Sequence, residues 1–318
     1  MGLLTTVRDH LAMASGDYVA IFKDAHIPPL PAVVSQLLIE ISLPEPDTAR
    51  LESILSADPE IAVKVLRYAN SGFYGLQTQV VSIRHAITLL GLRDIHTLVL
   101  SGAIREAIPA QENSLFDHQA YWTDAMVRSL LARSLALHGD FSTQADVAFT
   151  AMLLADVAVP VFLRNWRKYY ESVVDRWRQT PQRLSAIERH DFGWDHAQAG
   201  AWILQYWGFP EMIISLAGSH TMNRQQIQEL GLTDTVATVV GAAALAPSSL
   251  VQDPDRGMEC LAAIQDSLQM PTDTIVTVLT EVQSDFEVIS AQFNLQNESV
   301  TRLLANLRTA LGSEVTAP

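Results

Sequence analysis

The chain has 318 residues and a formal net charge of −14, with 21 Lys and Arg residues against 35 Asp and Glu residues. A field of that sign repels polyphosphates and no basic tract offsets it, so we expect no nucleic-acid partner. Hydrophobic residues make up 48% of the chain, which is typical of a folded protein rather than a disordered one. Cys260 is the only cysteine, which excludes an internal disulfide and a thiolate zinc cluster.

No continuous apolar run reaches the roughly 20 residues that a membrane-spanning helix needs. No leader with basic, apolar and small-residue sections opens the chain. We therefore expect a cytoplasmic protein without a membrane span.

Helix signals are dense in the first third of the chain, and strand signals are scarce. Asp58-Pro59-Glu60 reads as an N-cap, a first-turn proline and a dipole-matched acid, and predicts a helix toward Asn70. Ser82 is expected to cap a second helix that ends at Gly91, and a third helix begins near Asp94. These signals predict an all-α fold.

Two segments of this region allow a second interpretation. The helix pair 82–91 and 94–107 could form a helix-turn-helix, but its apolar residues and balanced charges favour two packed core helices. The proline-dense segment 27–31 could be a ligand for a polyproline-binding module. Because it leads directly into a helical run, we favour prolines that precede a helix.

Two polar, proline-containing stretches, 109–116 and 247–257, divide the helical segments. They predict an N-terminal helical lobe at residues 1–112, a second helical lobe at 113–246 and a C-terminal helical extension at 247–318.

The acids and histidines that could act in catalysis or bind a metal lie in the second lobe. The almost entirely apolar stretch 148–163 holds one carboxylate, Asp156, and a buried charge is costly unless it is paired. His196 and His220 lie near apolar helical runs, where a lone histidine is more often a satisfied core group than a ligand. His190-Asp191 lies in a polar stretch that we expect to be a solvated loop. The sequence contains no Gly-rich phosphate loop, GxSxG elbow or HExxH helix.

Four motifs follow one another in the first lobe: a PPLP entry at 27–31, a DP-capped helix at 57–59, LxxANSxxY at 66–75 and SIxxAIxxLG at 81–91. In this order and spacing the chain resembles the HDOD domain family, more weakly as far as about residue 246. The resemblance implies an HD-domain-like helical bundle in two lobes. The weaker matches are Trp122, Ala148, Phe149, Leu153, Leu154, Glu188, His196, Gly200, Trp207, Pro210 and His220.

Resemblance to the catalytic HD phosphohydrolases implies a degenerate metal site. Where such relatives carry adjacent His and Asp ligands, this chain has Ala155-Asp156. The counterpart of an earlier histidine is Asp124, and the stretch 239–244 supplies no late aspartate. We expect no catalytic residue and no metal cofactor, with Asp156 paired to a histidine. The alternative is one divalent metal ion, and the remaining candidate ligands are Asp156, His196, His220 and Asp124.

The resemblance implies a non-enzymatic regulator in bacterial signal transduction that binds a protein partner, such as one in a sensor-kinase, receiver or cyclic-di-GMP pathway. One alternative is a weak metal-dependent phosphohydrolase acting on a nucleotide or cyclic dinucleotide. Another is a nucleotide-sensing pseudoenzyme with a small ligand between the lobes. Phe73 and Tyr74 have a second interpretation, packing under the first lobe. The candidate contact residues are Lys64, Arg67, Asn70, Ser71, Phe73 and Tyr74.

Overall fold

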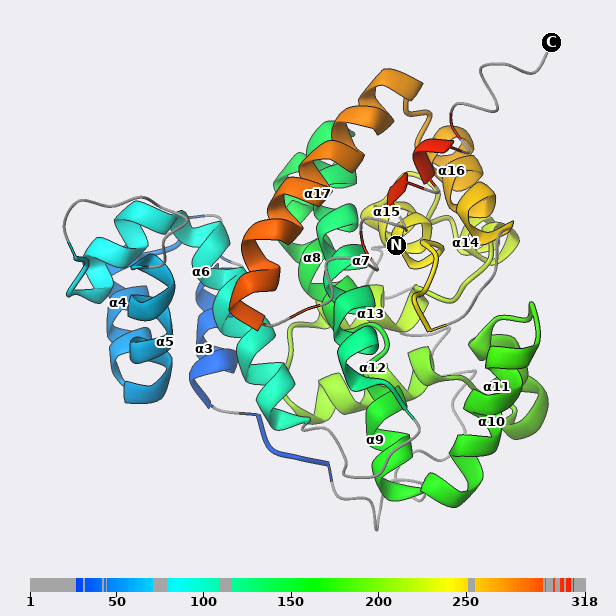
Figure 1. Ribbon diagram of the computed structural model, residues 1–318, viewed down its shortest axis with the longest axis horizontal. Coiled ribbons are helices and arrows are strands. Elements are labelled where there is room, and N and C mark those ends of the chain that lie inside the picture. Colours follow the sequence, from blue (N-terminus) through cyan, green and yellow to red (C-terminus); the bar gives the residue numbers. More distant parts are fainter. Residues whose placement is uncertain are drawn as a thin grey trace.

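The computed structural model describes residues 27–30, 32–41, 43, 45–70, 79–108, 116–250 and 255–293, and several residues between 295 and 311. Every regular element in this part of the chain is helical, which confirms the all-α prediction (Figure 1). The elements are α3 (Ala32–Ile41), α4 (Thr48–Ser56), α5 (Pro59–Ala69), α6 (Ile83–Ala107), α7 (His118–His138), η2 (Ser142–Gln144), α8 (Ala145–Leu154), α9 (Ala158–Asn165), α10 (Arg167–Gln179), α11 (Leu184–Phe192), α12 (His196–Tyr206), α13 (Glu211–Ser219), α14 (Arg224–Glu229), α15 (Val236–Ala244), α16 (Asp255–Ser267) and α17 (Thr272–Phe293).

The first lobe consists of α3, α4, α5 and the first half of α6 (Figure 1). The carboxylate of Asp58 accepts hydrogen bonds from the first backbone N–H groups of α5, and the hydroxyl of Ser82 does so at the start of α6. Both caps confirm the sequence prediction. They satisfy donors that a helix N-terminus otherwise leaves without a partner.

α6 is bent at Gly91, where the two predicted helices meet. Gly91 has φ 77° and ψ 166°, a left-handed conformation that favours glycine, so the helical hydrogen bonding is interrupted there. In the second half of α6, Leu98, Val99 and Leu100 are buried in the core. Burial of these residues supports two packed core helices rather than a helix-turn-helix.

The segment before α3 contacts the second lobe. The indole Nε1 of Trp207, at the end of α12, donates to the backbone oxygen of Pro28 over 2.9 Å, and Pro28 is buried. α3 then begins at Ala32, directly after the prolines. Of the two interpretations, a segment that leads into a helix and fastens it to the other lobe fits this arrangement.

The C-terminal extension packs along the centre of the molecule. α17 lies beside α7, and α7 in turn packs on α8 (Figure 1). The hydroxyl of Ser134 donates to Glu281 over 2.8 Å, and the far end of α17 brings Phe293 against Gly102 of α6. α17 therefore contacts both α7 and the second half of α6.

The apolar stretch 148–163 forms two helices rather than one continuous helix. α8 ends at Leu154 and α9 begins at Ala158, with Asp156 in the turn between them. Pro160 explains the break, since in a continuous helix its ring would clash with the carbonyl of residue 156. Backbone hydrogen bonds between residues three apart close the turn, as where the Val159 N–H donates to the Asp156 oxygen over 2.9 Å. The turn frees Asp156 to point away from the apolar helices.

Two stretches, Ile83–Ala107 and Ser142–Asn165, are long and apolar enough to cross a membrane by length and composition. Buried residues make up 61% and 83% of their apolar windows, as expected for core helices of a folded protein. They are therefore only a weak indication of a membrane span. The sequence expectation overlooked them because it required an unbroken apolar run.

Asn70 closes the segment that follows α5. Its amide donates to the backbone oxygens of Val80 and Leu66, and its side-chain oxygen accepts from the Val80 N–H, each over 2.7 Å. Residues 71–78, with the predicted contact residues Ser71, Phe73 and Tyr74, lie outside the described residues. The side chain of Asn70, predicted to contact a partner, is thus engaged internally.

We expect Asn70→Ala to lower the free energy of unfolding by about 2–3 kcal/mol, because two backbone groups of the buried Val80 lose their partner. Urea denaturation monitored by circular dichroism measures this. The control is Arg67→Ala, three residues earlier and exposed, which should change stability by less than about 0.5 kcal/mol. An equal loss of stability in both variants would contradict a structural role for the Asn70–Val80 hydrogen bonds.

Candidate functional site

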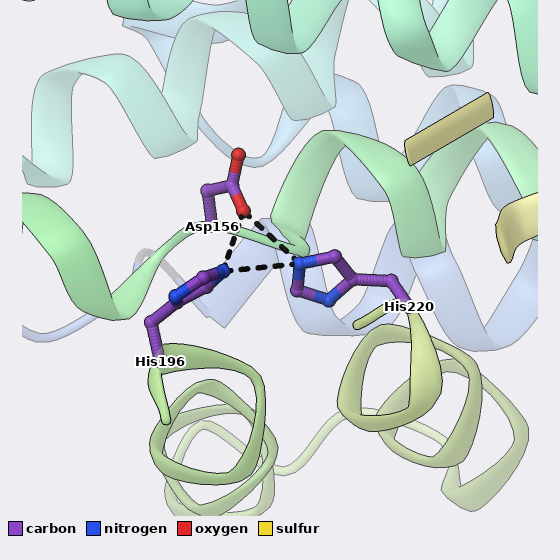
Figure 2. A group of neighbouring side chains, drawn as sticks. All are labelled: Asp156, His196 and His220. Atoms are coloured by element: carbon purple, nitrogen blue, oxygen red, sulfur yellow. Dashed lines mark hydrogen bonds and ion pairs between the residues drawn. The ribbon is translucent and has the colours of Figure 1, made fainter. Parts of the chain in front are cut away.

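Three side chains far apart in the sequence converge on one point of the second lobe (Figure 2). Asp156 comes from the α8–α9 turn, His196 from the first turn of α12 and His220 from the end of α13. The Asp156 Oδ1 lies 3.2 Å from the His196 Nε2 and 3.1 Å from the His220 Nε2. The two Nε2 atoms are 3.2 Å apart. We call these three residues the Asp156 cluster.

Each imidazole is held from behind through its Nδ1. The His196 Nδ1 lies 2.5 Å from the Glu188 Oε2, and Glu188 also accepts from the hydroxyl of Tyr170. The His220 Nδ1 lies 2.6 Å from the backbone oxygen of Ala217. Because carboxylate and carbonyl oxygens accept, we assign a proton to both Nδ1 atoms. Both Nε2 atoms then face each other and the Asp156 carboxylate.

One additional cation is required at the centre of the cluster. Two unprotonated Nε2 atoms and a carboxylate oxygen within about 3.2 Å would otherwise repel one another. A proton on the His196 Nε2 reduces the repulsion, because it can be donated to the Asp156 Oδ1 or the His220 Nε2. A single metal ion at the same point would also reduce it.

The ionisation of the cluster follows from its charges. Burial alone would lower the pKa of His196, but Glu188 and Asp156 outweigh it and raise that pKa well above its usual value. Burial opposes the ionisation of Asp156, yet its bonds to His196 and His220 and the charge of Arg128 hold its pKa well below the usual range. Arg128 Nη1 lies 2.8 Å from the Asp156 Oδ2. Both carboxylate oxygens are thus paired, one with a guanidinium and one with imidazoles.

The predicted pairing of Asp156 with a histidine is therefore present, and it involves both histidines rather than one. The sequence analysis missed Arg128 and the positioning roles of Glu188 and Tyr170. A signal for Arg128 was available, since a basic residue within the otherwise mostly apolar α7 needs an acid inside the fold.

Asp124, the fourth candidate ligand, is engaged elsewhere. It accepts from the Ser248 hydroxyl over 2.6 Å and from the backbone and hydroxyl of Ser249. Burial raises the pKa of Asp124 against these bonds and against the charge of Arg128. Asp124 thereby fastens α7 to the segment after α15, and among the described residues it does not join the Asp156 cluster.

The His190-Asp191 pair lies away from the cluster. It belongs to α11, so the prediction of a loop was wrong, and Gly193 with φ 78° ends that helix. The predicted solvation of His190 is observed, since its side chain is 83% exposed, and Asp191 pairs with Arg176. α11 forms because an apolar face at Leu184 and Ile187 packs on the core, which the polar residues had masked.

The Asp156 cluster fits one metal ion and not two. Ligand atoms at about 2.0–2.1 Å from a tetrahedral ion lie roughly 3.4 Å apart, close to the spacing found here. The Nδ1 contacts with Glu188 and Ala217 also resemble those behind metal-bound histidines. Among the described residues, however, only these three side chains form such a group, and Arg128 places a fixed positive charge beside it.

A cavity of about 80 Å³ adjoins the cluster. Asp124, Arg128, Asp156, His196 and His220 contribute to its walls, with aromatic side chains from α7 and α10. It lies between helices of the second lobe, including α7, α10, α12 and α13, and α16 of the C-terminal extension, and not between the two lobes where a small ligand was expected.

The remaining predicted contact residues lie on α5. Arg67 is exposed. Lys64 is engaged in ion pairs with Glu60 on its own helix and with Glu106 on α6. These pairs, opposed by partial burial, raise the pKa of Lys64.

The family model of the HDOD domain matches residues 27–222. The chain therefore belongs to the HDOD family, as its four motifs indicated. The match ends just after His220, so it covers the first lobe and all three members of the Asp156 cluster.

Two curated proteins are similar in sequence. One is an uncharacterized protein of Treponema pallidum (strain Nichols), 23% identical over 197 residues, which are 61% of this chain and 37% of that protein. The other is the cyclic di-GMP phosphodiesterase CdgJ of Vibrio cholerae, 25% identical over 132 residues, which are 41% of this chain and 28% of that protein. The matches thus span about a third of the curated relatives.

Solved structures share the fold. An HDOD domain protein of unknown function from Geobacter sulfurreducens has a TM-score of 0.63 at 18% identity, covering 94% of this chain and 97% of that one. A protein of Marinobacter aquaeolei VT8, provisionally named a signal transduction protein, has a TM-score of 0.61 at 18% identity, covering 96% of this chain and 67% of that one. A protein of Shewanella amazonensis SB2B, provisionally named a phosphohydrolase, has a TM-score of 0.58 at 19% identity, covering 95% of this chain and 100% of that one.

We expect Asp156→Ala to lower the free energy of unfolding by about 3–5 kcal/mol, because it leaves Arg128 and the histidine pair without their acid. Asp156→Asn should cost less, since its amide oxygen still accepts a hydrogen bond. Chemical denaturation at pH 7 measures both, with the exposed Asp140→Ala as a control. If all three variants were as stable as the wild type, the pairing of Asp156 with Arg128 and the histidines would not contribute to stability.

Proposed function

We propose that this protein is a non-enzymatic signal-transduction regulator of the HDOD type that acts by binding a protein partner. Membership of the HDOD family supports a signalling role. The observation that supports a non-enzymatic role is that the polar atoms of the Asp156 cluster already have partners within the protein. Its carboxylate is paired with a guanidinium and two imidazoles, and each imidazole is bonded at its Nδ1.

A dinuclear hydrolytic centre needs more ligands than this lobe offers. Ala155 stands beside Asp156, and α15 carries no acid or histidine. Asp124 is occupied by two serines. If a single divalent ion bound, Asp156, His196 and His220 would hold it, and it would supply Lewis acidity and an activated water. Glu188 would orient His196, and Arg128 would hold the second oxygen of Asp156.

A second candidate function is weak, metal-dependent hydrolysis of a nucleotide or cyclic dinucleotide. The spacing of the Asp156 cluster favours it, because it suits one ion. Similarity to the phosphodiesterase CdgJ also supports it, although it covers only 41% of this chain. We rank it second because the ligands for a bridging pair of ions are missing among the described residues.

We expect no stoichiometric transition metal in the purified protein and no metal-dependent turnover of cyclic di-GMP, because a proton already satisfies the cluster. Elemental analysis after dialysis, and product analysis with added Mn²⁺, test this. One equivalent of metal that survives dialysis, disappears in His220→Gln and accompanies turnover would favour the second candidate function.

The partner surface that we propose lies on α5. The signalling pathway that we propose is bacterial and cytoplasmic. Arg67 and Val63 occupy adjacent turns of α5, and the side chain of Val63 is 54% exposed. Arginine is enriched at protein interfaces, and the neighbouring Val63 adds exposed apolar surface. Lys64 is less suitable as a contact, because its ammonium group is already shared by Glu60 and Glu106.

We expect Arg67→Glu to keep the melting temperature and to weaken partner binding by about tenfold, since charge reversal at an interface adds repulsion. Lys64→Glu should instead lower the melting temperature, because it places three carboxylates together. Quantitative affinity capture from the native host, paired with melting curves, measures both. The matched control is Arg164→Glu, exposed on α9. Equal partner recovery by Arg67→Glu and wild type would place the interface elsewhere.

A further inference from the structure

The buried hydrogen-bond donors that have no acceptor among the described residues include three groups of the second lobe: the Arg128 Nε, the Tyr121 hydroxyl and the Trp177 indole nitrogen. These side chains are 8%, 4% and 6% exposed. A buried donor without an acceptor is costly, and such groups are few in folded proteins. All three side chains line the same cavity, the one of about 80 Å³ beside the Asp156 cluster.

The carboxylates that line this cavity already have donors. Asp156 accepts from the Arg128 Nη1 and lies within 3.2 Å of both histidine Nε2 atoms, and Asp124 accepts from two serines. Glu259, at the edge of the cavity, is paired with Arg183 over 2.9 Å. The cavity therefore has an excess of donors, one of which is the Nε of the charged Arg128 guanidinium. A ligand that matches it carries several acceptors and a negative charge.

We propose that this cavity is a binding site for a small oxyanion of the size of phosphate, held by Arg128, Tyr121 and Trp177. The cavity volume sets the size, since pockets for nucleotide-sized ligands are typically about 300 Å³ or larger. The oxyanion is either free inorganic phosphate or the phosphoryl group of a small molecule. This site goes beyond the proposed partner-binding function and does not depend on it.

The Arg183–Glu259 ion pair bears on the source of the oxyanion. Both residues line this cavity and also a larger neighbouring hollow of about 510 Å³ between α14, α15 and α16. A nucleotide would have to separate the pair to reach from the cavity into the hollow. Free phosphate requires no such movement, so we expect it to bind without a nucleoside.

The test removes the two neutral donors one at a time. Tyr121→Phe deletes only the hydroxyl, and Trp177→Phe deletes the indole N–H and keeps an aromatic ring. Calorimetric titration and melting curves with inorganic phosphate in low-salt buffer give affinity and stability for each, with chloride as the control anion. Tyr206→Phe, a 62% exposed tyrosine on α12, is the matched control.

We expect phosphate, but not chloride, to bind the wild type and raise its melting temperature. Each of the two cavity variants should bind phosphate about tenfold more weakly, as expected for loss of one donor to a charged acceptor. Without phosphate, Tyr121→Phe should melt at or above the wild-type temperature, because no existing bond is lost. Tyr206→Phe should match the wild type in every measurement.

Four results would overturn the proposal. Phosphate without effect on the wild type would exclude the site. Unchanged phosphate affinity in both cavity variants would show that phosphate binds elsewhere. A lower melting temperature of phosphate-free Tyr121→Phe would show that its hydroxyl already has a partner, such as a bound water. Adenosine monophosphate that binds more than tenfold tighter than phosphate would refute the size argument and point to a nucleotide.

Discussion

The second lobe is organised around the partly buried carboxylate of Asp156, whose charge must be compensated. Asp156 lies between a guanidinium on one oxygen and two imidazoles on the other. An ionised carboxylate in an apolar lobe is tolerated only with such partners. Since the partners come from α7, α12 and α13, this single charge fixes the positions of three helices relative to the α8–α9 turn.

The compensation extends outward by one further layer. Glu188 of α11 holds His196, and Tyr170 of α10 holds Glu188. The backbone of α13 holds His220. A network of this kind is stable only when each of its members has a partner, because a half-satisfied buried network is worse than an apolar core. The same arrangement would orient two imidazoles and a carboxylate toward a metal ion, so the occupant of its centre, a proton or a metal ion, distinguishes the two candidate functions.

Much of the fold could be predicted from local signals. Asp58, Ser82 and Gly91 act on their own neighbours along the chain, and all three were assigned correctly. The break at Asp156 was missed because Pro160 was read as part of an apolar run, although its ring forbids a continuous helix. α11 was missed because the period of its apolar face was hidden among charged residues.

The site was predictable in its members and not in its connections. Asp156 was singled out because a buried charge needs partners, and the resemblance to HD phosphohydrolases added His196 and His220 as candidate ligands. The basic residue in α7 indicated that an acid lies nearby, but not that this acid is Asp156. Asn70 was assigned to a partner surface from its place in a motif, whereas its amide bonds the backbone of Val80. Pairings between residues far apart in the chain depend on the packing of whole helices, which local patterns do not contain.

The most direct measurement is the protonation of the two histidines, by nitrogen-15 NMR of the protein as purified at pH 7. Spectra of His196→Gln and His220→Gln supply the assignments. The account predicts a cationic His196 and a neutral His220 protonated at Nδ1, with no metal bound. Two neutral imidazoles, both unprotonated at Nε2 and shifted by one equivalent of bound metal, would contradict it.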